Sequence, residues 1–232
     1  MKLKAYASDK RLLEFQPLEI KNRPPDWWHK LKKMFTILDT KTGINIPTPT
    51  IRACPGVMDF VRKPIVIRSW TDAIFKIYPD GRASVSTPKH NGGEMYIGIH
   101  EQKQYGELYP NHAVVKIVNP WVMIGSDRTN FLCTDVHYEP ELRKHGIFVA
   151  PGITNFYDQH VCNIFLVFPL KEESYQVSIK YDQPLMAVFP MTNDTVKIEM
   201  NKVSKDELNE ISNAFPSTFL GRYYTRKHTR RK

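Results

Sequence analysis

The sequence has few cysteines, few glycines and no long apolar run, and each shortage excludes a class of protein. Its 232 residues include only 3 cysteines, which are too few and too widely spaced for a disulfide framework or a Cys-x-x-Cys zinc pair. No stretch approaches the roughly 20 consecutive apolar residues that span a bilayer, and the N-terminus lacks the apolar segment of a secretory signal. We therefore expect a protein that is made and kept inside a cell, with no membrane partner.

The motifs of common enzymes are missing as well. The chain has no Gly-x-Ser-x-Gly elbow, no Walker-type glycine loop and no dinucleotide fingerprint. His137 and Glu139, with His160 downstream, offer the ligand types of a facial-triad iron or manganese site. The short chain between the two histidines leaves little room for the strands that usually separate such ligands. We predict no catalytic residue, no metal and no cofactor, and interpret these histidines as surface or hydrogen-bonded side chains.

The cysteines have two readings. Cys54 lies in the turn sequence Ala53-Cys54-Pro55-Gly56, where the basic neighbour Arg52 could lower its pKa and make it reactive. A structural thiol is the alternative that we favour, and we predict that Cys54, Cys133 and Cys162 are all buried.

The composition favours a mainly β fold. Seventeen prolines against 11 glycines, with 41% hydrophobic and 12% aromatic residues, argue against a helical bundle and suit many short strands joined by turns. Pro79-Asp80-Gly81 predicts a hairpin turn, and the continuous apolar run 164–168 predicts a strand covered on both faces. The expected strands are 65–67, 73–78, 82–85, 113–118, 121–124, 164–168, 176–180, 184–190 and 195–200.

Two helices are expected beside the strands. Residues 24–35 predict a short helix that Asp26 caps, with Trp27, Leu31, Met34 and Phe35 on one face. Residues 204–215 predict a second, with Ser204 and Glu207 as a capping box and Leu208, Ile211 and Phe215 along a buried side. The fold class is a single β-sandwich, β-clip-like or jelly-roll body with a short N-terminal and a C-terminal helix. We predict an N-terminal extension over 1–23, one β-rich domain over 24–216 and a basic tail over 217–232.

Positive charge is concentrated at the end of the chain. The formal charge is +9, yet without the last twelve residues 27 basic and 24 acidic residues remain. The basic residues of this tail are Arg222, Arg226, Lys227, Arg230, Arg231 and Lys232. A polybasic end neutralises phosphates without reading bases, so the tail predicts binding to DNA or to an acidic partner. A solubilising or partner-docking end is the alternative.

Several segments carry a resemblance to a known family. They are Pro25-Asp26-Trp27-Trp28, Ile51 to Phe60 with its Cys-Pro-Gly turn, Ile117 to Trp121 with Asn-Pro-Trp, and Pro184 to Pro190. In order and spacing they resemble an uncharacterised family of tailed bacteriophage proteins, many of them marine, over residues 24 to 192. That resemblance implies a phage origin and a location in the virion or the host cytoplasm.

A second, weaker resemblance concerns the second half of the chain. Gly152 to Tyr157, followed by the strand 184–190, is similar to the dUTPase and dCTP-deaminase pattern, in which a carboxylate activates water. Here Asn155 stands at the carboxylate position, and an amide is no general base. This resemblance implies a nucleotide pocket with Asn155, Tyr157 and Asp158, where Asp158 would have to supply the base.

Two functions of different classes follow from these observations. The favoured one is a non-enzymatic virion structural or assembly protein whose β-body contacts other virion proteins or copies of itself, with its basic tail on DNA or an acidic partner. The alternative is a nucleotide-binding enzyme of the dUTPase type, or an inactive relative of one.

Overall fold

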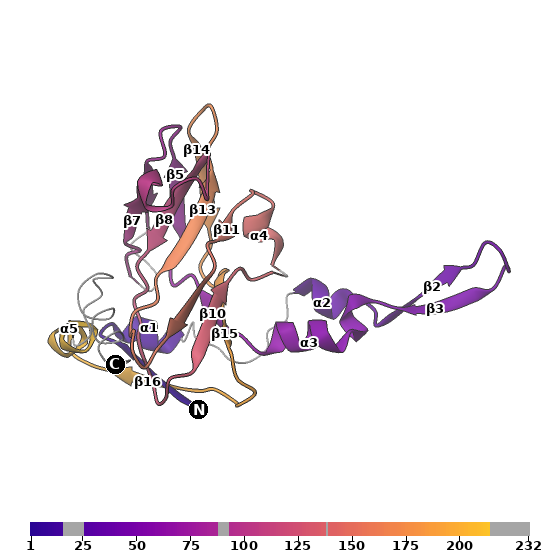
Figure 1. Ribbon diagram of the computed structural model, residues 1–232, viewed down its shortest axis with the longest axis horizontal. Helices are drawn as coiled ribbons and strands as arrows, with labels where there is room; N and C mark the ends of the chain where they lie inside the picture. The colour runs from indigo at the N-terminus through magenta and orange to yellow at the C-terminus, as the bar shows by residue number, and fades with distance from the viewer. Residues whose placement is uncertain (16–25, 88–92, 138, 214–232) are drawn as a thin grey trace, which may run out of the picture.

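The structure has a β-rich body from which a thin arm projects (Figure 1). It is a computed structural model, and it describes residues 1–15, 26–87, 93–137 and 139–213. No helix among these residues is both long enough and apolar enough to cross a bilayer. The helical segments are α1 (Lys10–Phe15), α2 (Asp26–Lys30), η1 (Ile51–Ala53), α3 (Pro55–Arg62), η2 (Gln102–Gln104), α4 (Pro140–Arg143) and α5 (Lys205–Asn213).

Four small sheets make up the body. Their strand orders are β16-β1-β9, β12-β10-β15-β4, β11-β13-β8-β7 and β14-β5-β6. The first contains β1 (Lys2–Ala7), β9 (Val122–Gly125) and β16 (Lys197–Lys202), and the second contains β4 (Ile65–Arg68), β10 (Asn130–Thr134), β12 (Gly152–Asn155) and β15 (Pro184–Pro190). The third contains β7 (Ile97–His100), β8 (His112–Ile117), β11 (Phe148–Val149) and β13 (Ile164–Pro169), and the last contains β5 (Ala73–Ile77), β6 (Ala83–Ser86) and β14 (Tyr175–Ile179).

All four sheets turn apolar side chains toward one shared core. Aromatic pairs connect them: the Phe75 and Phe168 rings stack with centroids 5.5 Å apart, which joins β5 to β13. Trp70 and Trp121 meet edge to face at 5.5 Å. Such geometries suit the ring quadrupoles and add to the stability that burial itself provides. The expected mainly β, sandwich-like body is therefore confirmed.

Several local predictions are confirmed in detail. The turn between β5 and β6 has Gly81 at a φ of +84°, a conformation that favours glycine, and Asp80 accepts a hydrogen bond from the Arg82 amide at 3.1 Å. On β13 three successive side chains, Leu166 to Phe168, are fully buried, as expected for a strand covered on both faces.

The helix predicted over 24–35 is wrong in its second half. α2 ends at Lys30, and Met34 and Phe35 instead begin strand β2 (Met34–Leu38), which pairs with β3 (Asn45–Pro49). Both side chains are 47% exposed. A helical stripe would have no body surface to pack against at this point, whereas pairing with β3 satisfies the backbone groups of each segment that face the other.

The terminal helix matches its predicted start but not its predicted burial. The Ser204 hydroxyl accepts a bond from the Glu207 amide at 3.1 Å, and the Glu207 carboxylate accepts one from the Ser204 amide at 2.8 Å, which makes the expected capping box. Leu208 and Ile211 are only half-buried, and Phe215 lies outside the described residues. α5 lies at the edge of the body, so it has too little surface beneath it to bury these side chains (Figure 1).

The expected N-terminal extension begins with a strand of the body. β1 is the central strand of its sheet, parallel to β16 and antiparallel to β9, and Leu3, Ala5 and Ala7 have 0% exposure. The alternation of buried and exposed residues in Lys2–Ala7 is the only local signal of this strand, and it is short.

Replacing Leu3 by alanine should therefore destabilise the whole body. Removal of a fully buried leucine side chain costs about 2 to 5 kcal/mol, so we expect the free energy of unfolding in urea to fall by that amount. Lys4→Ala, at the exposed neighbouring position, should change it by less than about 0.5 kcal/mol. Equal effects of the two substitutions would contradict a structural role for β1.

Candidate interaction site: the arm and its junction with the body

The arm consists of α2, the β2–β3 hairpin, η1 and α3, and it extends away from the body along the longest axis of the molecule (Figure 1). At the tip of the hairpin the Asp39 carboxylate accepts bonds from the Lys41 amide at 2.9 Å and from the Thr42 hydroxyl at 2.7 Å. The bond from Thr42, followed by that from Lys41, lowers the pKa of Asp39. Gly43 completes the turn at a φ of +68°. The tip is thus a well-formed turn with a charged carboxylate.

The hairpin exposes an unusual amount of apolar surface. Its exposed apolar side chains, each between 46% and 62% accessible, are Met34, Phe35, Ile37, Leu38, Ile44 and Ile46. Side chains alternate between the two faces of a strand, so Met34 and Leu38 lie on one face while Phe35, Ile37 and Ile46 lie on the other. Together the six half-exposed side chains present about 500 Å² of apolar surface, divided between the two faces. Neither face of the hairpin is covered by the body.

The base of the hairpin is held by hydrogen bonds to carbonyl groups. Arg52 donates through Nη1 to the carbonyl oxygens of His29 at 3.1 Å and Leu31 at 2.7 Å. The Thr50 hydroxyl donates to the Lys32 carbonyl at 2.6 Å. These bonds satisfy backbone oxygens at the end of α2, where a helix leaves acceptors without intrahelical partners. They also fix the direction in which the hairpin leaves the helices.

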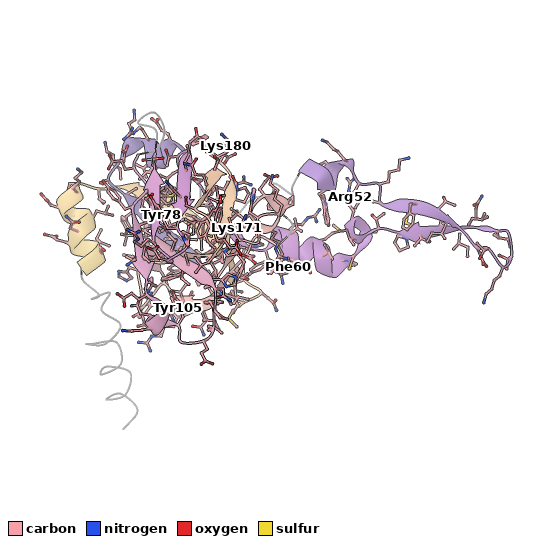
Figure 2. The ribbon with its side chains drawn as sticks, turned by 90° about the horizontal axis from the view of Figure 1, so that it is seen from above. Arg52, Phe60, Tyr78, Tyr105, Lys171 and Lys180 are labelled. Atoms are coloured by element: carbon pink, nitrogen blue, oxygen red, sulfur yellow. The ribbon has the colours of Figure 1, made fainter. Side chains whose placement is uncertain are left out.

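One aromatic side chain of α3 connects the arm to the body. The Phe60 ring lies 4.6 Å from the Phe189 ring of β15 and 5.3 Å from the His137 ring, centroid to centroid. Figure 2 shows Phe60 where the arm meets the body and Arg52 further out along the arm. A shallow groove runs beside this contact between α3, β4 and β15, and Arg68, His137 and Glu139 are its polar lining residues.

His137 is oriented by a chain of polar contacts. Arg143 Nη2 lies 2.6 Å from His137 Nδ1 and 3.1 Å from Asp135 Oδ2. A guanidinium can only donate, so Nδ1 accepts and the neutral ring carries its proton on Nε2, 3.4 Å from the Thr134 hydroxyl. Partial burial, followed by the charge of Arg143, lowers the pKa of His137. The imidazole beside Phe60 is therefore a neutral packing partner.

The residues of the suggested nucleotide pocket form a turn at the end of β12. Asn155 Oδ1 accepts from the Tyr157 amide at 2.9 Å, and its Nδ2 donates to the Arg128 carbonyl at 3.1 Å. Arg128 lies over the Tyr157 ring at 5.3 Å and 3.7 Å from the Asp158 carboxylate. The structure brings these three residues together, and it engages the Asn155 amide and the Asp158 carboxylate in contacts that shape the turn.

The remaining sequence candidates lie elsewhere. Arg222, Arg226, Lys227, Arg230, Arg231 and Lys232 of the basic tail are outside the described residues. His160 is buried, and its Nδ1 lies 3.4 Å from the Ile211 carbonyl oxygen of α5. Within the described ranges no three His, Cys, Asp or Glu side chains are grouped as a metal site would need.

The prediction for the cysteines is confirmed for two of the three. Cys133 and Cys162 are buried with their Sγ atoms 3.4 Å apart, and the contact with Cys133, followed by burial, raises the pKa of the Cys162 thiol. Cys54 is exposed, contrary to expectation, because it precedes Pro55 at the start of α3, on the arm rather than in the body.

The chain matches no protein-family model, no curated protein and no solved structure. The geometry of the arm and the body is therefore the guide to function.

The hairpin, the most exposed apolar element among the described residues, was not predicted from the sequence. The sequence does contain a signal for this hairpin. Met34 to Leu38 is a mainly apolar run that includes the β-branched residues Thr36 and Ile37. Gly43 supplies a turn residue, and beyond it Ile44 and Ile46 alternate with polar residues. The tryptophans before this run favoured a helical interpretation that extended too far.

Acid should weaken the structure partly through His137. Because the folded-state pKa of His137 is lowered, the unfolded chain binds more protons below about pH 6.5, so stability falls as the pH decreases through that region. We expect His137→Gln to reduce the loss in unfolding free energy between pH 7 and pH 5. The exposed His145→Gln is the matched control and should leave that loss unchanged, and an identical loss in both variants would refute the assignment.

Proposed function

We propose that this chain is a non-enzymatic structural or assembly protein that acts through protein contacts made by its arm. The observation that carries the proposal is the apolar surface on both faces of a hairpin that stands clear of the body. An isolated two-stranded hairpin is marginal in water, and large exposed apolar patches mark interaction sites. A covering partner would supply the burial that the body does not.

The architecture supports a division of roles between the two parts. The body has a continuous core that needs no partner, whereas the hairpin contributes none of the core residues. Phe60 and Arg52 fix the direction of the arm, so a partner would meet a positioned element rather than a loose loop. A positioned element loses less conformational entropy on binding, which favours affinity.

The resemblance to tailed-phage proteins extends this proposal to a virion. On that basis the partners are other virion proteins or copies of the chain, and the basic tail adds contacts with DNA or an acidic surface. In this proposal the arm makes the protein contacts, and the tail adds a salt-dependent contribution to the binding affinity.

Replacing the apolar side chains of one hairpin face should abolish assembly without unfolding the body. In the Phe35→Ser, Ile37→Ser, Ile46→Ser variant we expect an unchanged urea transition for the body, because these side chains pack on none of its core. In a phage lysate complemented with tagged protein, mass spectrometry of purified particles should detect the wild-type chain and at least tenfold less of this variant.

A triple variant of the body provides the matched control. Ile99, Leu108 and Ile153 are also large exposed apolar residues, and their replacement by serine should leave incorporation unchanged. Equal incorporation of the arm variant and the wild type, or absence of the wild type from particles, would contradict the proposed function.

The nucleotide-binding alternative has its own test. A thermal-shift screen with dUTP, dCTP and Mg²⁺ should leave Tm unchanged for an assembly protein, since only a ligand that binds the folded state raises it. A rise in Tm that disappears in Asp158→Asn would favour the dUTPase-like enzyme instead. His145→Gln serves as the control for a nonspecific effect of substitution.

A further inference from the structure

The hydrogen bonds of the hairpin determine which backbone groups face outward. The Thr50 amide donates to the Lys33 carbonyl, and the Asp39 amide donates to the Ile44 carbonyl, both at 2.9 Å. Bonded and non-bonded pairs alternate along an antiparallel ladder, so every second residue turns its N–H and C=O away from the partner strand. The outward residues are Met34, Thr36 and Leu38 on β2, and Asn45, Pro47 and Pro49 on β3.

The two outer edges of the hairpin are consequently different. Proline has no N–H, so Pro47 and Pro49 remove two of the donors from the β3 edge and block the addition of another strand there. The β2 edge retains its N–H groups at Met34, Thr36 and Leu38, and no charged residue lies between Met34 and Leu38. Natural proteins protect exposed edges with charge, proline or bulges. The hairpin protects β3 and leaves β2 open.

We propose that β2 of a second copy of this chain pairs antiparallel with β2 around a two-fold axis at Thr36. This inference rests on the proposed function, in which the arm is the interaction element, and it names the partner. The result is a four-stranded sheet made from two hairpins, with the proline edges outermost. Such a sheet exceeds the three strands needed for independent stability, whereas a single hairpin does not.

The register around Thr36 matches every residue with a suitable neighbour. Thr36 faces Thr36 of the second copy, and Met34 faces Leu38. Phe35 faces Ile37, which is an aromatic and β-branched pair of the kind that stabilises sheets. The outward groups of Met34, Thr36 and Leu38 then form roughly six ladder bonds, two for each facing pair.

Charge complementarity selects this register as well. With the axis at Thr36, Lys33 of each copy faces Asp39 of the other, which gives two opposite-charge pairs at the ends of the paired strands. Sliding one strand by two residues keeps the bonding pattern but moves the axis by one residue, to Phe35 or Ile37. Lys33 would then face Ile37 or Lys41 of the other copy, so both charge pairs would be lost. The chain is complementary to itself in one register.

A proline at the axis tests the proposed edge. Thr36→Pro removes the N–H of the central pair in both copies but none of the donors that bond β2 to β3. Sedimentation velocity of the full chain should show a concentration-dependent dimer, and Thr36→Pro should raise its Kd at least about tenfold. Asn45→Pro makes the same change at the β3 edge and should leave the Kd unchanged.

Crosslinking tests the register without weakening the dimer. In a Cys54→Ser background, Thr36→Cys places two cysteines about 5.5 Å apart, Cα to Cα, across the axis, so a short bismaleimide should link the chains. Asn45→Cys is the control, because the two outer strands are about 14 Å apart even before the offset along the strands. Thr36→Cys should crosslink at least tenfold more than Asn45→Cys.

The outcomes separate this inference from the proposed function. A monomeric wild-type chain, or a dimer whose Kd is unchanged by Thr36→Pro, would overturn pairing through β2. If incorporation into particles still requires Phe35, Ile37 and Ile46, a different protein covers the arm and the assembly role survives. A dimer linked through position 36 whose arm is dispensable in particles would instead support the pairing and contradict the assembly role.

Discussion

The contact of Phe60 with Phe189 and His137 is what makes the arm a directed element of the molecule. It ties α3 to the outer surface of the body, and the Arg52 bonds carry that direction onward to the hairpin. Without these contacts the hairpin would be flexibly attached and would adopt many orientations relative to the body. The neutral state of His137 belongs to the same arrangement, because a protonated ring beside Phe60 and Arg143 would be desolvated and repelled.

The body buries most of its apolar residues, whereas the hairpin of the arm exposes its own. In the body, short strands from four sheets place aromatic pairs such as Phe75 and Phe168 in one dry core. The hairpin places residues of the same kind in solvent on both faces, although its turn and its ladder are well formed. The proposed interaction depends on this difference, because Phe35 and Ile37 lie exposed on an element whose direction is fixed.

Most of the body was predictable because its strands have clear signals in the local sequence. The Asp80-Gly81 turn, the apolar run at Leu166 to Phe168 and the Ser204–Glu207 cap each encode their structure within a few residues. Three features were not predictable in this way. β1 depends on a partner strand almost two hundred residues away, Leu208 and Ile211 depend on what surface lies beneath α5, and β2 depends on a turn that follows it. The candidate site lay in the last of these, so composition and motifs alone pointed to the tail instead.

The pairing of β1 with β16 also has a consequence for synthesis on the ribosome. The pairing of Lys2 with Lys197 cannot form until almost the whole chain has been synthesised. The β2–β3 hairpin, in contrast, pairs residues that lie within about twenty positions of each other. Contacts between residues close in sequence form faster than contacts between distant residues. The nascent chain therefore exposes its apolar hairpin well before its core is complete. Neighbouring ribosomes on one messenger would hold several such hairpins close together, so the proposed pairing of β2 with β2 would begin during translation.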